Sequence, residues 1–179
     1  MTALFSELKI KDVTLKNRVG VAPMCQYSAT DGLMNDWHRV HLGARAMGGA
    51  ALVFCEATAV CPEGRITPGC AGLWNDAQVD AVAPINAFIT SMGAVPAIQI
   101  AHAGRKGSCA APWDGGASLP DDAGGWPTFG PTDAAFDPDG TRTWKAPQSM
   151  TTADIAAAKA MFVAAAKRAL DAGYKVLEI

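Results

Sequence analysis

The stretch "AALVFCEATAV", residues 50–60, is a continuous apolar run rich in residues that favour strands. A strand exposed on one face alternates polar and apolar side chains, whereas a parallel strand covered on both faces is apolar along its length. Residues 50–60 are therefore predicted to form a buried strand of a parallel sheet, an arrangement typical of α/β proteins.

Strands and helices are expected to alternate on both sides of this run. Apolar runs at residues 19–22, 94–104 and 174–179 predict three more strands, and a small hairpin is expected at residues 7–18. The order is then a hairpin followed by β-α-β-α-β-α-β. This order predicts parallel strands joined by right-handed crossovers.

The helices are predicted at residues 35–49, 75–93 and 151–173, where apolar residues recur at helical spacing. The first two segments begin with an Asn-Asp pair and the third with Thr151, which are good N-capping residues, and each segment ends at glycine. The positions expected to face the core are Trp37, Val40, Ala44 and Met47, then Val79, Val82, Ile85, Ile89 and Met92, and finally Ile155, Ala158, Phe162, Ala166 and Ala169.

The connection at residues 103–150 is much longer than an ordinary loop between a strand and a helix, and it is rich in proline and glycine. It leaves the carboxyl end of the strand at residues 94–104, where α/β folds place their sites. Long ordered loops commonly bind ligands or act as lids. We therefore expect this segment to overhang the site.

Composition limits the classes of protein and partner. The chain has 179 residues, of which 50% are hydrophobic, enough for one core but fewer than the about 250 of a complete eight-stranded α/β barrel. With 15 basic and 17 acidic residues its net charge is −2, which favours neither nucleic acid nor an anionic membrane as partner. The five cysteines are irregularly spaced, without a C-x-x-C pair, which favours a reducing, cytoplasmic location.

Two common cofactor motifs do not occur, neither the G-x-G-x-x-G fingerprint nor the P-loop. His38 and His41 are three residues apart on the helix expected at residues 35–49, a spacing that suits a metal. No further ligand pattern completes a metal site. We therefore expect no metal and hydrogen-bonded roles for both imidazoles.

Polar side chains occur where the predicted strands end. Cys25 and Tyr27 follow the first strand, Glu56 lies near the end of the second, and Gln99 and His102 near the end of the third. Because the carboxyl ends of parallel strands converge on one pocket, these groups are predicted to share it. Each also has a plain packing interpretation, since a free cysteine commonly behaves as a small hydrophobe.

Three motifs together carry a resemblance: "APMCQYSATDG" at residues 22–32, "FCEATAVCPEGRITPG" at residues 54–69 and "IQIAHAGRKGS" at residues 98–108. The chain resembles the amino-terminal half of the Old Yellow Enzyme family, in its xenobiotic-reductase-like or thermophilic-like branch. The resemblance implies half of a TIM (β/α)₈ barrel, with residues 1–179 as a partial domain that includes the loop at residues 103–150. It also implies FMN as cofactor, NADPH or NADH as reductant, and a small activated alkene as substrate.

The resemblance also assigns roles to residues. It implies that Pro23, Met24, Ala57 and Gln99 contact the flavin, with the Gln99 amide suited to the pyrimidine edge of the ring. Cys25 is expected beside the reactive part of the ring, where it tunes the redox potential. The catalytic set is then Cys25 and Tyr27, with Tyr27 at the border of the substrate.

In this family the pair of substrate-anchoring histidines and the proton-donating tyrosine follow the strand that here ends at Ile179. We therefore expect the ene-reductase activity in a full-length, homo-oligomeric parent, and an incomplete, inactive protein from this chain alone. Two alternatives stay open: a non-catalytic flavin-binding half-barrel or one piece of a split enzyme, and an unrelated α/β enzyme with Cys25 as nucleophile. The last lacks a His/Asp relay to activate the thiol.

Overall fold

The computed structural model describes residues 3–136 and 144–179. Its centre is a four-stranded sheet in the order β3 (Gly20–Val21), β4 (Leu52–Ala59), β5 (Val95–Ala101) and β8 (Val176–Glu178). Each adjacent pair is parallel, so all four strands end at the same edge. This is the predicted strand order, and β3 and β8 are its outer strands.

Three long helices connect the strands: α1 (Asp36–Met47), α2 (Asp76–Ser91) and α3 (Thr152–Asp171). Each begins with a capping box in which the N-cap side chain, from Asn35, Asn75 or Thr151, accepts from the third helical N–H. The third helical residue in turn accepts from the N-cap N–H. The predicted helix starts are confirmed. They could be predicted from the sequence because these caps are local interactions between residues three apart.

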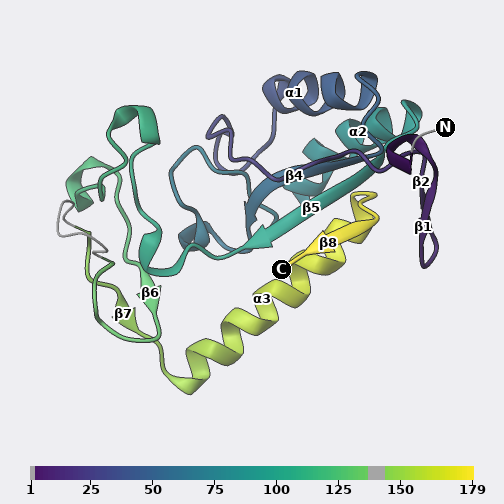
Figure 1. Ribbon diagram of the computed structural model, residues 1–179. Helices are drawn as coiled ribbons and strands as arrows, with labels where there is room; N and C mark the ends of the chain where they lie inside the picture. The colour runs from purple at the N-terminus through teal and green to yellow at the C-terminus, as the bar shows by residue number, and fades with distance from the viewer. Residues whose placement is uncertain (1–2, 137–143) are drawn as a thin grey trace.

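The predicted hairpin is also confirmed, with β1 (Leu8–Ile10) antiparallel to β2 (Val13–Leu15). Lys11 in its turn has φ 53°, a left-handed backbone conformation. In Figure 1 the hairpin lies near the amino ends of the sheet strands, at the opposite end of the molecule from β6 and β7. The short 3₁₀ turn η1 (Ala3–Phe5) precedes it.

The long connection at residues 103–150 is folded into short elements rather than one extended loop. They are η3 (Gly104–Lys106), η4 (Pro112–Asp114), η5 (Asp121–Ala123), β6 (Phe129–Gly130) and β7 (Gln148–Ser149). β6 and β7 pair in parallel, and residues 137–143 lie outside the described part. Figure 1 shows this segment beyond the carboxyl ends of β4 and β5, on the side where it was expected.

The core lies between the sheet and the helices. Val53 and Cys55 of β4 and Ile98 and Ile100 of β5 are buried in one apolar cluster with side chains of all three helices. Side chains on the other face of the sheet, such as Phe54, are only half-buried. The apolar face predicted for α2 is confirmed, with Val82, Ile85 and Ile89 buried and Val79 and Met92 packed against the same cluster.

The core face predicted for α1 is wrong. Trp37, Val40 and Met47 are 57%, 70% and 67% exposed, and Ala44 is exposed as well. The buried residues of α1 are His38, Leu42, Gly43 and Ala46. α1 lies so close to α2 that a Cβ on Gly43 would be 2.8 Å from Phe88 Cε1. Close packing at Gly43 therefore turns this face of α1 toward α2, and the face that carries Trp37, Val40 and Met47 stays exposed.

The prediction for one position of α3 is wrong, and α3 also buries small residues. Ile155 is exposed, and the residues that α3 buries are Ala165 and Ala169. Ala169 was predicted to face the core. Phe162 and Ala166 pack against the cluster as partly buried side chains, as predicted. No helix among the described residues is both long enough and apolar enough to cross a membrane.

Asn86 joins α2 to the turn before β8, and its substitution is expected to destabilise the fold. Its Nδ2 donates to the carbonyl oxygen of Ala172 at 2.9 Å, between residues that are both buried. Asn86→Leu leaves this carbonyl without its donor, so the free energy of unfolding should fall by about 1–3 kcal/mol. Urea denaturation measures the change, with Ala87→Leu at the exposed neighbouring position as control. Equal stability of the two variants would contradict the prediction.

Candidate functional site

A β-bulge in β4 sets the geometry of the candidate site. Cys55 pairs with Ile98 and Ala57 pairs with Gln99, so the register shifts between Cys55 and Ala57 and leaves Glu56 as the extra residue. A bulge re-aims side chains relative to a regular strand. Ala57 therefore shares a face with Gln99, while the carboxylate of Glu56 is buried at 3% exposure.

The segment that follows β3 passes over this bulge. The Gln26 N–H donates to Glu56 Oε2 at 2.8 Å, and the Ala29 N–H donates to the Gly69 carbonyl oxygen at 2.9 Å. Tyr27 has φ 50°, in the left-handed region, and Gly69 makes the close approach to it possible, because a Cβ there would be 2.4 Å from the Tyr27 carbonyl oxygen. The segment is thus bent tightly around the carboxyl end of β4.

Cys25 is half-buried in this bend, next to Ala57 and Cys70. Burial raises the pKa of its thiol to about 11, with the Cys70 and Glu56 side chains adding to the rise. The Ala57 N–H and the Tyr27 side chain, which lie near the sulfur, act on the pKa in the opposite direction. The thiol is therefore neutral at physiological pH, which argues against a nucleophilic role.

Tyr27 links the site to the long connection. Its ring packs edge-to-face against Trp113 of η4, with ring centroids 5.7 Å apart. A hollow of about 380 Å³ opens beside the two rings and is also lined by Thr67, Ala110 and Leu119. Burial raises the pKa of the Tyr27 phenol to about 12, so the hydroxyl is protonated and able to donate. Residues 103–150 thus contribute directly to the surroundings of Tyr27.

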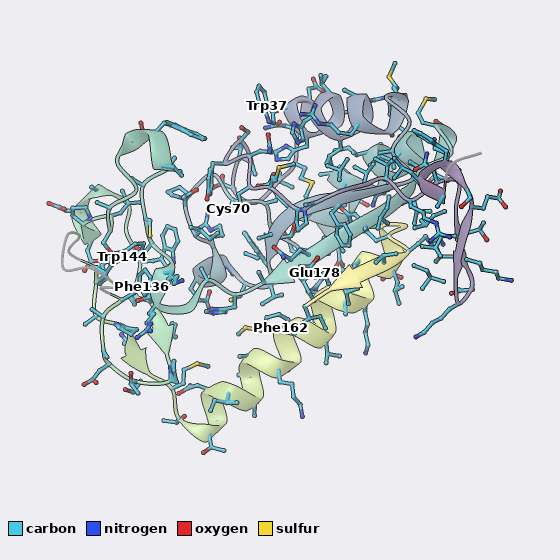
Figure 2. All side chains as sticks on the ribbon, in the orientation of Figure 1. Trp37, Cys70, Phe136, Trp144, Phe162 and Glu178 are labelled. Carbon is cyan, nitrogen blue, oxygen red and sulfur yellow. The ribbon has the colours of Figure 1, made fainter. Side chains whose placement is uncertain are left out.

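Gln99 and Ala57 lie side by side on adjacent strands, as their register shows. Gln99 in turn pairs with Glu178 of β8, and its Nε2 donates to Glu178 Oε1 at 2.6 Å. Figure 2 shows Glu178 near the carboxyl end of β5. Three neighbouring strands therefore present Ala57, Gln99 and Glu178 along one row.

Pro23 and Met24 occupy the start of the bend, where Pro23 is half-buried and Met24 is 51% exposed. The Met24 carbonyl oxygen accepts from Gln26 Nε2 at 2.7 Å. Of the residues predicted for the site, Cys25 and Tyr27 adjoin the bulge together with Ala57, and the sheet register places Gln99 next to Ala57.

His102 is separated from this group. It packs against Gly64, whose Cβ position is 3.1 Å from His102 Cδ2, and its Nδ1 accepts from the Gly104 N–H at 3.0 Å. Burial lowers the pKa of its imidazole. His102 therefore shapes the turn after β5, and the prediction that it shares the pocket is not supported by any contact with Cys25 or Tyr27 in the described structure.

The long connection is fastened to the end of β4 by stacked side chains. The Arg65 guanidinium lies 4.9 Å from the ring centroid of Trp126 and 5.6 Å from that of Trp74. Trp126 also donates from Nε1 to the Glu63 carbonyl oxygen at 3.0 Å. Such cation–π contacts and hydrogen bonds hold residues distant in sequence together.

Two residues around the site, Cys70 and Trp113, were not predicted as part of it. Glu56 was predicted to share the pocket, but its place in a bulge was not, because the bulge depends on pairing with β5, which one strand alone does not reveal. Trp113 approaches Tyr27 only through the fold of a long connection. Cys70 is buried and hydrogen-bonded to Thr67, with no motif to mark it.

All five cysteines are free thiols. Within residues 3–136 and 144–179, no three His, Cys, Asp or Glu side chains gather as a metal site would need. His38 has the hydrogen-bonded role expected of it, because its Nδ1 accepts from the Asn35 N–H at 3.2 Å.

Comparisons with known proteins agree with this geometry. The family described as NADH:flavin oxidoreductase / NADH oxidase matches residues 3–179. An NADPH dehydrogenase of Listeria welshimeri is 42% identical over 181 residues, covering 100% of this chain and 48% of that protein. An NADH:flavin oxidoreductase of Gibberella zeae is 42% identical over 185 residues, covering 99% of this chain and 43% of that protein.

Solved structures give the same result. Morphinone reductase superposes with a TM-score of 0.79 at 26% identity, over 98% of this chain and 46% of its own. The old yellow enzyme homologue from Zymomonas mobilis superposes with a TM-score of 0.80 at 26% identity, over 98% of this chain and 47% of its own. The chain thus spans about half the length of these relatives and has the architecture of half a TIM barrel. Because the family match extends over nearly the whole chain, the chain belongs to the NADH:flavin oxidoreductase / NADH oxidase family, the family of the Old Yellow Enzyme.

Proposed function

We propose that this chain is the amino-terminal half of an FMN-dependent ene-reductase, which uses NADPH or NADH to reduce the activated C=C bond of α,β-unsaturated carbonyl compounds. The observation that carries the proposal is the convergence of Cys25, Tyr27, Ala57 and Gln99 at one edge of the parallel sheet. In a flavin oxidoreductase family, this edge is where a cofactor is best held.

The donors and acceptors at this edge suit an isoalloxazine ring. Gln99 directs its Nε2 to Glu178, and its carbonyl oxygen accepts from no donor among the described residues. The main-chain N–H groups of Met24 and Cys25 likewise find no acceptor among them. The small side chain of Ala57 allows a flat ring to approach the strand. We therefore assign Pro23, Met24, Cys25, Ala57 and Gln99 to FMN binding.

Bound FMN supplies the hydride chemistry, and the residues of this chain bind the flavin ring, orient it and shield it from solvent. Gln99 offers a donor and an acceptor to the polar edge of the ring. The neutral thiol of Cys25 places a polarizable sulfur beside the ring without adding charge, which tunes the redox potential. The protonated hydroxyl of Tyr27 is available to donate a hydrogen bond to a substrate, and Trp113 packs edge-to-face against the Tyr27 ring.

A second candidate is a flavin-binding half-barrel without catalysis of its own, or one piece of a split enzyme. The observation in its favour is that the chain spans about half the length of its relatives.

The activity test compares this chain alone with the same chain mixed with a carboxyl-terminal half-barrel of the Listeria welshimeri relative. Both samples receive FMN, NADPH and cyclohexenone, and NADPH oxidation is followed by the loss of the reduced nicotinamide absorbance at about 340 nm. We expect enone-dependent oxidation in the mixture only. Flavin binding without turnover in both samples would favour the non-catalytic alternative, and turnover by the chain alone would show that the second half is dispensable.

The Cys25 thiol is expected to ionise, and therefore to be alkylated rapidly, only at high pH. Because its folded-state pKa is raised from 9.0 to about 11, alkylation by iodoacetamide should keep accelerating up to about pH 11, whereas the urea-unfolded chain should level off near pH 9. Mass spectrometry of the peptide that contains Cys25 measures both profiles. A folded profile that levels off below pH 8 would indicate an activated nucleophile instead.

Gln99 is expected to matter for FMN retention. In Gln99→Leu the polar edge of the ring loses its amide partner, so the Kd for FMN should rise by roughly tenfold to a hundredfold. Quenching of flavin fluorescence measures the Kd, and Gln148→Leu at an exposed position of β7 is the control. An unchanged Kd in Gln99→Leu would show that the amide faces away from the flavin.

A further inference from the structure

Glu56 has no role in the function proposed above, yet it is a buried carboxylate. Its exposure is 3%, and burying a charge is costly unless partners replace the lost water. Each of its two oxygens has a specific neighbour. Oε2 accepts the Gln26 N–H at 2.8 Å, and Oε1 lies 3.2 Å from Nε2 of His38, whose side chain is also buried.

His38 faces the carboxylate with Nε2, while its Nδ1 lies 3.3 Å from Asn35 Oδ1 and within hydrogen-bond distance of the Asn35 N–H. Nδ1 accepts from the Asn35 N–H at 3.2 Å as part of the capping box of α1. An imidazole that accepts at Nδ1 carries its proton on Nε2, the nitrogen that faces Glu56. The amino end of α1 thereby brings Nε2 to 3.2 Å from Glu56 Oε1, a close polar contact in which neither atom has hydrogen-bond geometry.

The bulge explains why Glu56 can make these contacts. In a regular strand Glu56 would alternate with Cys55, whose side chain packs in the helix-covered core. The register shift between Cys55 and Ala57 removes this constraint, so the carboxylate lies between α1 and the bend after β3. Bulges beside functional sites commonly re-aim one side chain in this way.

The bend has few other main-chain anchors. Among the described residues, Gln26 is the only member of Pro23–Ser28 whose main-chain N–H finds an acceptor. The contact with Glu56 therefore fixes the middle of the segment, between Cys25 on one side and Tyr27 on the other. The carboxylate also adds to the rise in the pKa of the Cys25 thiol, after burial and Cys70.

We propose that Glu56, supported by His38, is a positioning residue that holds the Pro23–Ser28 bend so that Cys25 and Tyr27 face the flavin. This inference rests on the proposed flavin site for its functional part. Its structural part, the anchoring of Gln26 by a bulged carboxylate, stands without any cofactor and is tested separately.

The first measurement uses the ¹⁵N-labelled chain without flavin. In Glu56→Leu, which keeps the volume but removes the acceptor, hydrogen exchange of the Gln26 amide should accelerate by about tenfold to a hundredfold. Alkylation of Cys25 should accelerate as well. Glu56→Gln keeps a side-chain oxygen for the Gln26 N–H and should restore most of the protection. Glu63→Leu, at a half-buried carboxylate in η2 (Pro62–Gly64), is the matched control and should change neither rate.

The second measurement uses the protein loaded with FMN. The absorption spectrum and midpoint potential of the flavin should shift in Glu56→Leu and return toward the parent values in Glu56→Gln. A residue that only stabilised the fold would lower thermal stability without moving either property. Should Glu56→Leu not fold, the double variant Glu56→Leu/His38→Leu carries the same test, because it leaves neither partner of the pair buried alone.

Three results separate the two proposals. An unchanged exchange rate of the Gln26 amide in Glu56→Leu would overturn the anchoring. Faster exchange with an unchanged flavin spectrum and potential would overturn the positioning role while the flavin site stands. Faster exchange in a protein that binds no FMN would contradict the proposed function and the positioning role, and leave only the anchoring.

Discussion

The parallel pairing of β4 with β5, interrupted by one bulged residue, is the constraint on which the site depends. Pairing fixes the positions of Cys55 and Ala57 relative to β5, and the extra residue between them puts Ala57 beside Gln99. Without the shift, Ala57 would follow the strand alternation onto the other face. The small residue and the amide are neighbours because of this single irregularity in the ladder.

The site combines one buried carboxylate with groups that stay neutral. Burial is the main cause that raises the pKa of both the Cys25 thiol and the Tyr27 phenol, and Glu56 contributes to each rise. A neutral thiol and phenol suit a site whose cofactor carries the electrons, because they offer hydrogen bonds and polarizability without competing charge. The buried carboxylate of Glu56 lies where His38 of α1 and the Gln26 N–H face its two oxygens.

Local signals in the sequence predicted the elements well. The caps at Asn35, Asn75 and Thr151 and the continuous apolar run of β4 act over a few residues, so they can be read from one chain. The motifs that carry the family resemblance also predicted Cys25, Tyr27, Ala57 and Gln99 as site residues, and their role at the flavin stays a prediction. The buried face of α1 could not be read in this way, because it depends on how closely Gly43 approaches Phe88 of another helix. The contact of Tyr27 with Trp113 likewise joins segments distant in sequence.

The stacking of Arg65 between two indoles has a consequence for observing this protein. Trp74 lies just before α2, whereas Trp126 belongs to the long connection, and the guanidinium holds both within cation–π distance. Indole emission depends strongly on neighbouring charge and on solvent. Any displacement of the connection away from the end of β4 would separate Trp126 from Arg65 while Trp74 kept its scaffold position. Trp126 and Trp74, two of the five tryptophans of the chain, would therefore respond differently to such a displacement, because Trp126 moves with the connection and Trp74 does not.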